Sequence, residues 1–243
     1  MERRTGDTIS IEGNYQYKSF NSQNAVQRFW HQSKARIIQA ALPTCLGEQV
    51  LDIGCGSGVI TNFLASLGAN AIGIDGSPEA IDFATKTFIN PNTKFIRGFV
   101  DEEFSLPFLV DKIYCLEVIE HIYYDQGKNM LLSFNKLLKP NGFVFLTTPN
   151  YFGVWPIIEW IFDLFQVTPK LVGEQHVEFY NTNKLKTLCQ EAGFSVVQTY
   201  IVNFLAPWIA PISWDLAIEM ERFELALRCP IGSSLVFILR KQL

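Results

Sequence analysis

Short runs of apolar, mostly β-branched residues alternate along most of this chain with longer stretches in which apolar residues recur at helical spacing. The short runs predict strands that are buried on both faces, and the longer stretches predict helices with one apolar face. The predicted strands are 49–53, 69–74, 94–97, 112–116, 142–148, 194–200 and 234–239, and the predicted helices are 25–42, 59–67, 78–88, 127–138 and 182–192. Strands that alternate with helices in this way indicate an α/β fold with a doubly wound, mostly parallel sheet of seven strands.

Residues that favour helix ends support several of these boundaries. Asn24 can accept hydrogen bonds from the first free amides of the helix that begins at residue 25, and Pro43 ends that helix. Ser77 can cap the helix that begins at residue 78. We expect one domain over 1–243, with an N-terminal segment and helix over 1–44.

Two aromatic-rich segments, 151–180 and 203–225, interrupt the alternation in the second half of the chain. They contain four of the five tryptophans, which are Trp155, Trp160, Trp208 and Trp214. The spacing of aromatic residues in the first segment predicts an amphipathic helix over 156–167. This helix is either a lid over a substrate or an ordinary extension of the core.

The composition indicates a large apolar core. Of the 243 residues, 48% are hydrophobic and 18% are charged, whereas an average soluble domain has roughly 25% charged residues. The net charge of −4 argues against a surface that neutralises nucleic-acid phosphates. Five cysteines without a close pair fit a reducing cytoplasm and give no zinc spacing. No charge-free apolar stretch reaches the roughly 20 residues of a membrane-spanning helix.

A glycine-rich turn follows the first predicted strand, in the sequence Leu51-Asp52-Ile53-Gly54-Cys55-Gly56-Ser57-Gly58. Glycines at alternate positions let the backbone turn tightly and let a ligand approach closely, and the next helix presents its first amides to that ligand. A dinucleotide site is one interpretation, but its usual spacing is G-x-G-x-x-G, and Gly58 comes one residue too early. Asp52 would also repel a pyrophosphate, whereas it can bind the ammonium of an amino-acid moiety.

A further acidic residue, Asp75, ends the next predicted strand and is followed by Gly76 and Ser77. A carboxylate at this place in an α/β sheet can accept hydrogen bonds from both hydroxyls of a ribose. A ribose site and an amino-acid site without a pyrophosphate site together describe S-adenosylmethionine (SAM).

With these residues the chain resembles the class I SAM-dependent methyltransferases, which have a Rossmann-like fold. The resemblance implies a cofactor site that consists of Arg36, Asp52, Gly54, Cys55, Gly56, Gly58, Asp75, Gly76, Ser77, Val100, Asp101 and Leu116. Val100 and Asp101 would face the adenine, and the carbonyl of Leu116 would meet the methionine end. Arg36 would approach the SAM carboxylate, although a solvated arginine is the alternative. The segment 138–150 also resembles the corresponding segment of the family.

Candidate chemistry follows the strand over 112–116, in the sequence Glu117-Val118-Ile119-Glu120-His121. If this segment forms a turn of helix, Glu117, Glu120 and His121 lie on one side of it. They would lie at the carboxyl end of the strand, where α/β sheets bind substrates. Methyl transfer to oxygen needs an acceptor held in line with the S–CH₃ bond and a group that takes its proton, a role that suits a neutral His121.

The E-x-x-E-H pattern resembles two branches of the family, the ubiquinone-biosynthesis O-methyltransferases and the small-RNA 3′-terminal 2′-O-methyltransferases. In the RNA branch this motif and a downstream histidine hold a divalent cation, and metal dependence is also associated with the quinone branch. The resemblance implies that Glu117, Glu120, His121 and His176 hold Mg²⁺ or another divalent metal. There are two alternatives: His121 acts as a base without a metal, or these side chains have only structural roles.

The aromatic insertions indicate the chemical class of the acceptor. Tryptophan and tyrosine suit an apolar pocket or a membrane interface, whereas an RNA channel would need positive charge, and Lys170 is the only lysine or arginine from 151 to 180. We therefore expect O-methylation of an apolar, polyprenyl-phenol-like small molecule by a cytoplasmic enzyme with peripheral membrane contact. The alternatives are a glycan or lipid-linked sugar of the cell envelope, RNA 2′-O-methylation, and a SAM-binding module without turnover.

Overall fold

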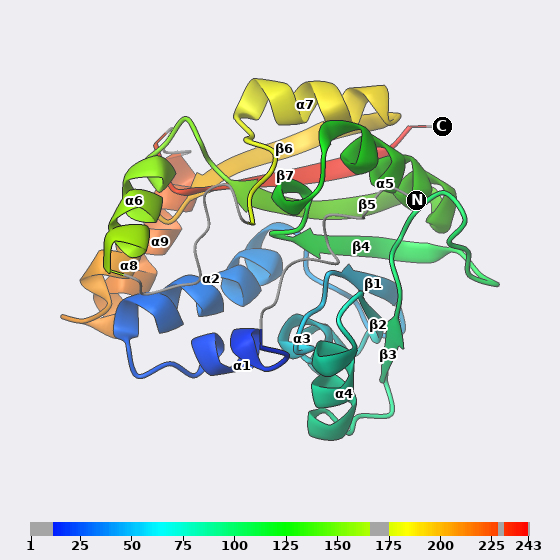
Figure 1. Cartoon of the computed structure of the whole chain (residues 1–243), viewed down its shortest axis with the longest axis horizontal. Coiled ribbons are helices and arrows are strands. Elements are labelled where there is room, and N and C mark those ends of the chain that lie inside the picture. Colours follow the sequence, from blue (N-terminus) through cyan, green and yellow to red (C-terminus); the bar gives the residue numbers. More distant parts are fainter. Residues whose placement is uncertain (1–11, 166–174, 228–230, 243) are drawn as a thin grey trace.

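A seven-stranded sheet forms the centre of the computed structural model, which describes residues 12–165, 175–227 and 231–242 (Figure 1). The strands are β1 Gln49–Ile53, β2 Asn70–Asp75, β3 Thr93–Arg97, β4 Val110–Leu116, β5 Leu138–Pro149, β6 Phe194–Val202 and β7 Ser234–Lys241. Their order is β3-β2-β1-β4-β5-β7-β6, in which β1 to β5 pair in parallel and β7 pairs antiparallel with both β5 and β6. The predicted doubly wound, mostly parallel sheet is confirmed. Its strand order reverses between β1 and β4, which is where open α/β sheets bind ligands.

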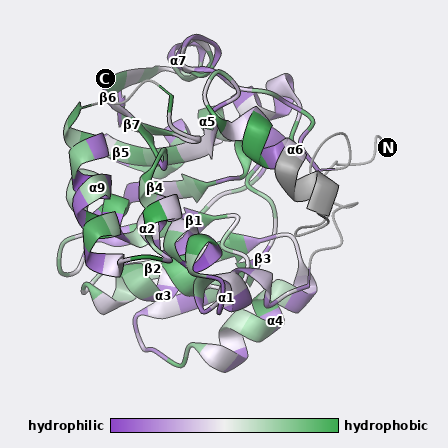
Figure 2. Ribbon diagram, turned by 90° about the vertical axis from the view of Figure 1, so that its left-hand side faces the viewer, coloured by the Kyte–Doolittle hydropathy of each residue, from purple (hydrophilic) through white to green (hydrophobic). Residues whose placement is uncertain are grey.

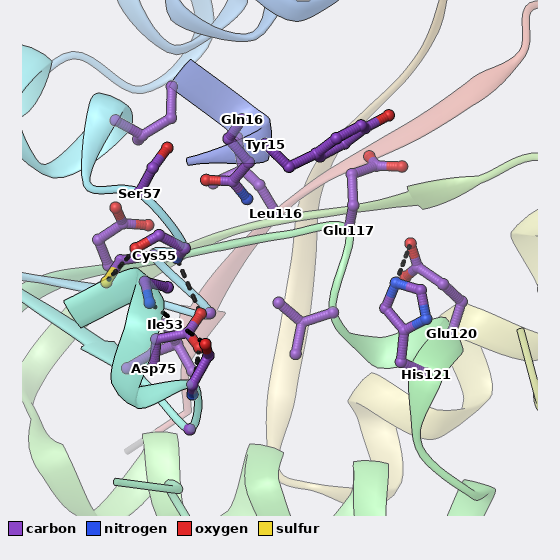
Figure 3. A pocket seen from close by; sticks show the side chains of 18 of the residues that line it. Tyr15, Gln16, Ile53, Cys55, Ser57, Asp75, Leu116, Glu117, Glu120 and His121 are labelled. Atoms are coloured by element: carbon purple, nitrogen blue, oxygen red, sulfur yellow. Dashed lines mark hydrogen bonds and ion pairs between the residues drawn. The ribbon is translucent and has the colours of Figure 1, made fainter. Parts of the chain in front are cut away.

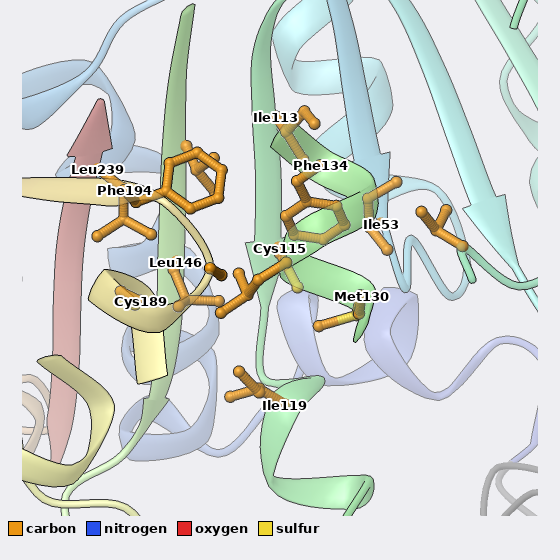
Figure 4. Close-up of a cluster of buried hydrophobic side chains, with 14 of the residues drawn as sticks. Ile53, Ile113, Cys115, Ile119, Met130, Phe134, Leu146, Cys189, Phe194 and Leu239 are labelled. Carbon is orange, nitrogen blue, oxygen red and sulfur yellow. The ribbon is translucent and has the colours of Figure 1, made fainter. Parts of the chain in front are cut away.

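Helices cover both faces of the sheet. They are α1 Tyr15–Phe20, α2 Ala25–Ala41, α3 Val59–Ser66, α4 Pro78–Thr87, α5 Tyr124–Leu137, α6 Trp155–Phe165, α7 Thr182–Glu191, α8 Ala206–Ile209 and α9 Trp214–Leu227, with a 3₁₀ turn, η2, at Ile119–His121. Alternate residues of a strand point to opposite faces of a sheet. Accordingly, Ile113 and Cys115 of β4 join the core beneath α5 and α7 (Figure 4). Tyr114, between them, joins the core beneath α2 and α3.

The capping residues expected from the sequence lie at helix starts. Oδ1 of Asn24 accepts hydrogen bonds from two amides in the first turn of α2, at 3.0 and 3.2 Å, and Oγ of Ser77 accepts one from Ala80 at 3.2 Å. Two boundaries differ from the prediction by three residues or more, because α5 begins at Tyr124 rather than at residue 127 and β5 begins at Leu138 rather than at residue 142. Oε1 of Gln126 accepts a hydrogen bond from the amide of the residue before the helix, at 3.1 Å, and so caps the earlier start of α5.

The aromatic insertions form helices at one end of the sheet, near α2 (Figure 1). The helix expected over 156–167 is observed as α6, and residues 166–174, which include Lys170, lie outside the described residues. The second insertion forms α8 and α9, which pack on Phe29 of α2. Hydrophobic and hydrophilic residues are mixed along both α6 and α9 (Figure 2). None of the helices in the described ranges combines the length and the apolarity that crossing a membrane requires.

Candidate active site

A cavity of about 1060 Å³ lies at the carboxyl ends of β1, β2 and β4, and α1 and α2 also line it. Residues that follow β1 and β2 form one end of it, and residues of η2, α2 and α6 form the other. Pockets for one small molecule usually measure ~300–1000 Å³. The cavity is therefore large enough for a cofactor and a second molecule.

The loop after β1 needs its glycines for both conformation and space. Gly54, Gly56 and Gly58 have φ angles of 70°, 48° and 81°, which side-chain-bearing residues rarely adopt. A Cβ atom on Gly54 would lie 2.3 Å from Cγ2 of Val118. Gly54, Cys55 and Gly56 line the cavity as expected, but Gly58 does not. Gly58 is the N-cap residue of α3 and turns the chain into that helix, and its role at the cofactor stays a prediction.

Two carboxylates, a buried one of Asp52 and a partly buried one of Asp75, lie at the adjoining ends of β1 and β2. Asp52 accepts a hydrogen bond from Oγ1 of Thr61 at 2.6 Å, and burial raises the pKa of Asp52 to about 7. Asp75 accepts hydrogen bonds from the amides of Gly56 and Ser77, both at 2.8 Å, and burial raises its pKa also (Figure 3). Carboxylates removed from water favour a ligand that brings positive charge or hydroxyl donors to them.

The other residues predicted for this end of the cavity also line it, and they are Gly76, Ser77, Val100, Asp101 and Leu116. The ring of Phe99 packs against Gly76, where a Cβ atom would lie 2.4 Å from the ring. Phe99 offers an apolar ring to this part of the cavity, a role that its sequence context did not indicate.

Arg36 does not line the cavity, which corrects its predicted role. Its guanidinium forms two hydrogen bonds with the carboxylate of Glu221 on α9, at 2.6 and 2.9 Å, and lies 4.3 Å from the ring centre of Phe29. Lys34, two residues earlier on α2, lines the cavity instead. The physical reason is helix geometry, because two positions differ by about 200° around the helix axis.

A cluster of Glu120, His121 and His176 forms the opposite end of the cavity, and each residue offers one potential ligand atom within 4.8 Å of the others. Glu120 and His121 belong to η2, directly after β4. The segment with His176 docks on η2 through backbone hydrogen bonds, since the amides of Val177 and Glu178 both donate to the carbonyl of Glu120, at 2.9 and 3.1 Å. This pairing brings together histidines that are 55 positions apart in the sequence.

The hydrogen bonds of the cluster assign a role to each donor and acceptor. Nδ1 of His121 lies 2.8 Å from the carbonyl oxygen of Gln175, so Nδ1 carries the proton and Nε2 keeps its lone pair. Burial lowers the pKa of His121, which keeps the ring neutral. Oε2 of Glu120 accepts a hydrogen bond from Thr148 at 3.0 Å, whereas Oε1 is buried without a hydrogen-bond partner among the described residues. Burial raises the pKa of Glu120, which favours a partner that neutralises its charge. A carboxyl oxygen without a hydrogen-bond partner beside two imidazole rings is a donor set that fits a divalent cation.

Glu117 does not join this cluster, which corrects the predicted set of four metal ligands. The segment forms a 3₁₀ turn that starts after Glu117, and Glu117 itself has a φ angle of 55°. Its Oε1 accepts a hydrogen bond from Oγ1 of Thr147 at 2.6 Å. The helical turn that would have aligned all three side chains is therefore absent from this segment, although Glu117 still lines the cavity.

A family model described as a methyltransferase domain matches residues 24–199, which is more than half of the chain. This range includes the glycine loop, both carboxylates and the cluster. The chain belongs to the SAM-dependent methyltransferases. SAM is the cofactor of this family, and the protein is a methyltransferase enzyme.

The curated relatives of this methyltransferase include enzymes named for ubiquinone biosynthesis. The "Ubiquinone biosynthesis O-methyltransferase" of Burkholderia pseudomallei (strain 1710b) is 28% identical over 193 residues, which cover 76% of this chain and 77% of that protein. The mitochondrial enzyme of the same name from Schizosaccharomyces pombe is 38% identical over 107 residues, which cover 42% of this chain and only 38% of that protein.

Solved structures with the same fold match nearly the whole methyltransferase. The N-methyltransferase NodS from Bradyrhizobium japonicum WM9, in complex with S-adenosyl-L-homocysteine, has a TM-score of 0.64 and 18% identity over 99% of this chain and 100% of that chain. The magnesium protoporphyrin IX methyltransferase from Synechocystis PCC 6803, also with bound SAH, has a TM-score of 0.63 and 17% identity over 98% of both chains. At these identities the likeness concerns the fold.

Residues of α1 cover the glycine loop of this methyltransferase, which the sequence did not lead us to expect. Tyr15 and Gln16 line the cavity (Figure 3). The side chain of Gln16 packs on Gly56, where a Cβ atom would lie 2.4 Å from Oε1 of Gln16. Tyr15 and Gln16 lie in a polar segment that carries no motif, so no local signal could have found them.

An aromatic wall, which we define as Trp30, Trp155 and Trp208, also lines the cavity. Trp30 of α2 stacks on Trp155 of α6, with ring centres 6.0 Å apart and planes 25° apart, and Nζ of Lys34 lies 4.3 Å from the ring centre of Trp30. Two members of the wall belong to the insertions, as the concentration of tryptophans there had indicated. Trp30 lies outside the insertions, and no motif around it indicated a role.

Proposed function

We propose that this methyltransferase transfers the methyl group of SAM to a hydroxyl group on an apolar or membrane-associated small molecule. The observation that carries the proposal is one cavity with two chemically different ends. Two carboxylates lie at one end, and a neutral imidazole lies beside an aromatic wall at the other.

In the proposed arrangement, SAM lies along the carboxyl ends of β1, β2 and β4. Asp75 accepts hydrogen bonds from the ribose hydroxyls, and Asp52 binds the ammonium. Val100 and Asp101 face the adenine, and the carbonyl of Leu116 meets the methionine end. The support for these roles is that each of these residues lines the cavity and that their strands are neighbours in the sheet. Val100 and Asp101 follow β3, Asp75 ends β2, Asp52 lies in β1 and Leu116 ends β4, and the strands are ordered β3-β2-β1-β4.

The acceptor oxygen attacks the methyl carbon in line with the S–C bond, so a C–O bond forms while the S–C bond breaks and S-adenosylhomocysteine leaves. The hydroxyl proton passes to Nε2 of His121, because Nδ1 is already engaged with the carbonyl of Gln175. Since burial lowers the pKa of His121, the ring is free to take this proton near neutral pH. The cavity walls hold the two reactants together, and this positioning supplies much of the acceleration.

The same cluster supports a divalent cation such as Mg²⁺ or Mn²⁺. Oε1 of Glu120 and the free ring nitrogens of His121 and His176 would hold it. Such an ion supplies a Lewis acid that makes the acceptor hydroxyl more acidic. With a cation bound, the lone pair of Nε2 of His121 is a metal ligand and cannot also take the proton, so the cation and His121 as base are alternative mechanisms. Loss of turnover in EDTA, restored by Mn²⁺, supports the cation, whereas turnover that is indifferent to EDTA leaves His121 as the base.

The aromatic wall and the outer surface of the insertions support an apolar acceptor. Ile157 and Trp160 on α6 are 61% and 65% exposed, and Ile212 after α8 is 85% exposed. Apolar side chains in such positions suit the surface of a membrane, and the relatives are named for ubiquinone biosynthesis. We therefore propose a cytoplasmic enzyme that contacts membranes peripherally. A glycan or lipid-linked sugar is the second candidate acceptor, and the net charge of −4 disfavours RNA.

The proposal is tested by incubating the protein with methyl-labelled SAM and separate lipid, glycan and RNA fractions. We expect label in the lipid fraction. Label in the glycan fraction would select the second candidate. If SAM bound normally but none of the fractions took label, the protein would be a SAM-binding module without turnover, and the proposed function would be wrong.

A further inference from the structure

A buried hydrogen-bonded group connects the first insertion to the cluster. The side chains of Glu159 on α6 and His176 are 3% and 5% exposed, and Nδ1 of His176 lies 3.0 Å from Oε1 of Glu159. The hydroxyl of Tyr151 lies 2.7 Å from the same Nδ1 and donates to the same Oε1 at 3.0 Å. Two polar side chains of the first insertion thus meet at one nitrogen of His176.

The chemistry of these groups determines where the proton of His176 lies. The hydroxyl of Tyr151 has one hydrogen atom, which it donates to Oε1 of Glu159, and burial raises the pKa of Tyr151, so the phenol keeps this hydrogen. A hydrogen atom on Nδ1 of His176 is therefore satisfied by Oε1 of Glu159, whereas a lone pair on Nδ1 would face the lone pairs of the carboxylate. Nε2 is left with the lone pair.

We propose that Glu159, assisted by Tyr151, is a positioning residue that holds His176 in the Nδ1–H tautomer. The lone pair of Nε2 is then free to act together with Glu120 and His121 as a ligand. The proposal rests on the proposed function, because it gives the insertion a role in the chemistry of the cluster. A carboxylate behind a histidine orients the ring and makes its other nitrogen a better ligand, and loss of such a carboxylate typically lowers metal affinity ~10–100-fold.

Helix α6 consequently contributes to the site in two ways. Trp155 and Ile158 of this helix line the cavity, and Glu159 lies behind His176. Ile157 and Trp160 of the same helix are exposed. The helix therefore joins the outer surface of the insertion to the cluster, and a change in how α6 is seated would reach His176 directly.

The first measurement needs no metal. The chain has three histidines, so the ring nitrogens can be followed by ¹⁵N NMR of the full-length metal-free protein, with His176→Gln identifying the signals of His176. We expect a protonated Nδ1 and a bare Nε2 in the wild type, and a mixture of both tautomers in Glu159→Gln. A protonated Nε2 in the wild type, or an unchanged tautomer in Glu159→Gln, would overturn the proposal.

The second measurement is the affinity for Mn²⁺ by calorimetry. We expect Glu159→Gln to bind Mn²⁺ ~10–100-fold more weakly than the wild type and Tyr151→Phe to show a smaller loss. Glu219→Gln is the matched control, because Glu219 is an exposed carboxylate paired with Arg222, and it should bind Mn²⁺ as the wild type does. An unchanged SAM affinity shows that the variants are folded.

The two measurements separate this inference from the proposed function. If the wild type bound no Mn²⁺, the cation in the proposed function would be wrong, and the tautomer of His176 alone would decide the role of Glu159. If Mn²⁺ bound equally well to the wild type and to Glu159→Gln, the positioning role would be wrong while the cation site would stand.

Discussion

The two ends of the cavity are built differently. The cofactor end comes from short continuous segments, in which one glycine loop follows β1 and one acidic turn follows β2. The acceptor end is assembled from α2, η2, the two insertions and the segment around His176, which are far apart in the sequence. A local segment can carry its function in a motif, whereas an assembled surface depends on how distant elements pack.

The largest expected effect is the loss of SAM binding when Asp75 is replaced. Asp75→Ala removes the proposed acceptor of the ribose hydroxyls and also frees the amides of Gly56 and Ser77 that the carboxylate orders. We expect calorimetric titration with SAM to show no measurable binding. Asp82→Ala, an exposed acidic position on the neighbouring helix α4, is the control and should bind normally. Unchanged affinity in Asp75→Ala would contradict the cofactor assignment.

Replacement of His121 separates the two ends. His121→Ala removes the proposed proton acceptor but no residue of the cofactor end, so turnover should fall ~100-fold or more while SAM affinity stays unchanged. Initial rates of methyl transfer and a SAM titration of the same preparation measure the two quantities. Equal losses in both would mean that the ends are not separable.

Asp52 gives the cofactor end a dependence on pH. Burial raises its pKa from 3.8 to about 7, so the folded, cofactor-free protein binds a proton that the unfolded chain has already released. The free energy of unfolding should therefore fall as the pH rises from about 4 to 7. Asp52→Asn should lose this part of the pH dependence and be more stable than the wild type above pH 7, which urea unfolding at pH 5 and pH 8 measures.

The same substitution should weaken the cofactor site. An amide cannot form an ion pair with the ammonium of SAM, so we expect Asp52→Asn to bind SAM about tenfold more weakly at pH 8. The affinity of the wild type should rise with pH through about 7, whereas that of Asp52→Asn should not. A parallel pH dependence in both proteins would show that Asp52 is not the group that titrates.

Arg36 belongs to neither end of the cavity, so its replacement should affect stability and not SAM binding. Arg36→Ala leaves the carboxylate of Glu221, 3% exposed, without its partner, so the free energy of unfolding should fall by about 2 kcal/mol. Arg222→Ala, which breaks an exposed pair, should change it very little. SAM affinity should be unchanged in both variants. A large loss of SAM affinity in Arg36→Ala would restore its predicted role at the cofactor.

The cofactor end of the cavity was easier to predict from the sequence than the acceptor end. The strand and helix pattern, the caps at Asn24 and Ser77, and most of the predicted cofactor residues could be read locally, because period, capping and glycine conformation are properties of neighbouring residues. The exceptions at this end depend on packing. Arg36 and Lys34 lie on different sides of α2, and the packing of α9, whose Glu221 is 185 positions later and binds Arg36, decides which of them faces the cavity.

The acceptor end could be predicted only in part. His121 and His176 were chosen together through a resemblance, and the structure brings them into one cluster. The assumption of a regular helical turn misplaced Glu117, because backbone conformation after a strand end is not fixed by spacing. Glu159 received no chemical role, since a single acidic residue in an aromatic helix gives no local sign that it will meet a histidine 17 positions later.

In the proposed function, both ends of the cavity form one site in which a hydroxyl of an apolar molecule receives the methyl group of SAM. The most direct test is mass spectrometry of a lipid extract incubated with SAM and either the wild type, Asp75→Ala or His121→Ala. We expect a new methyl ether with the wild type and none above background with either variant. A product methylated on nitrogen or carbon, or an ether formed equally well by the variants, would contradict it.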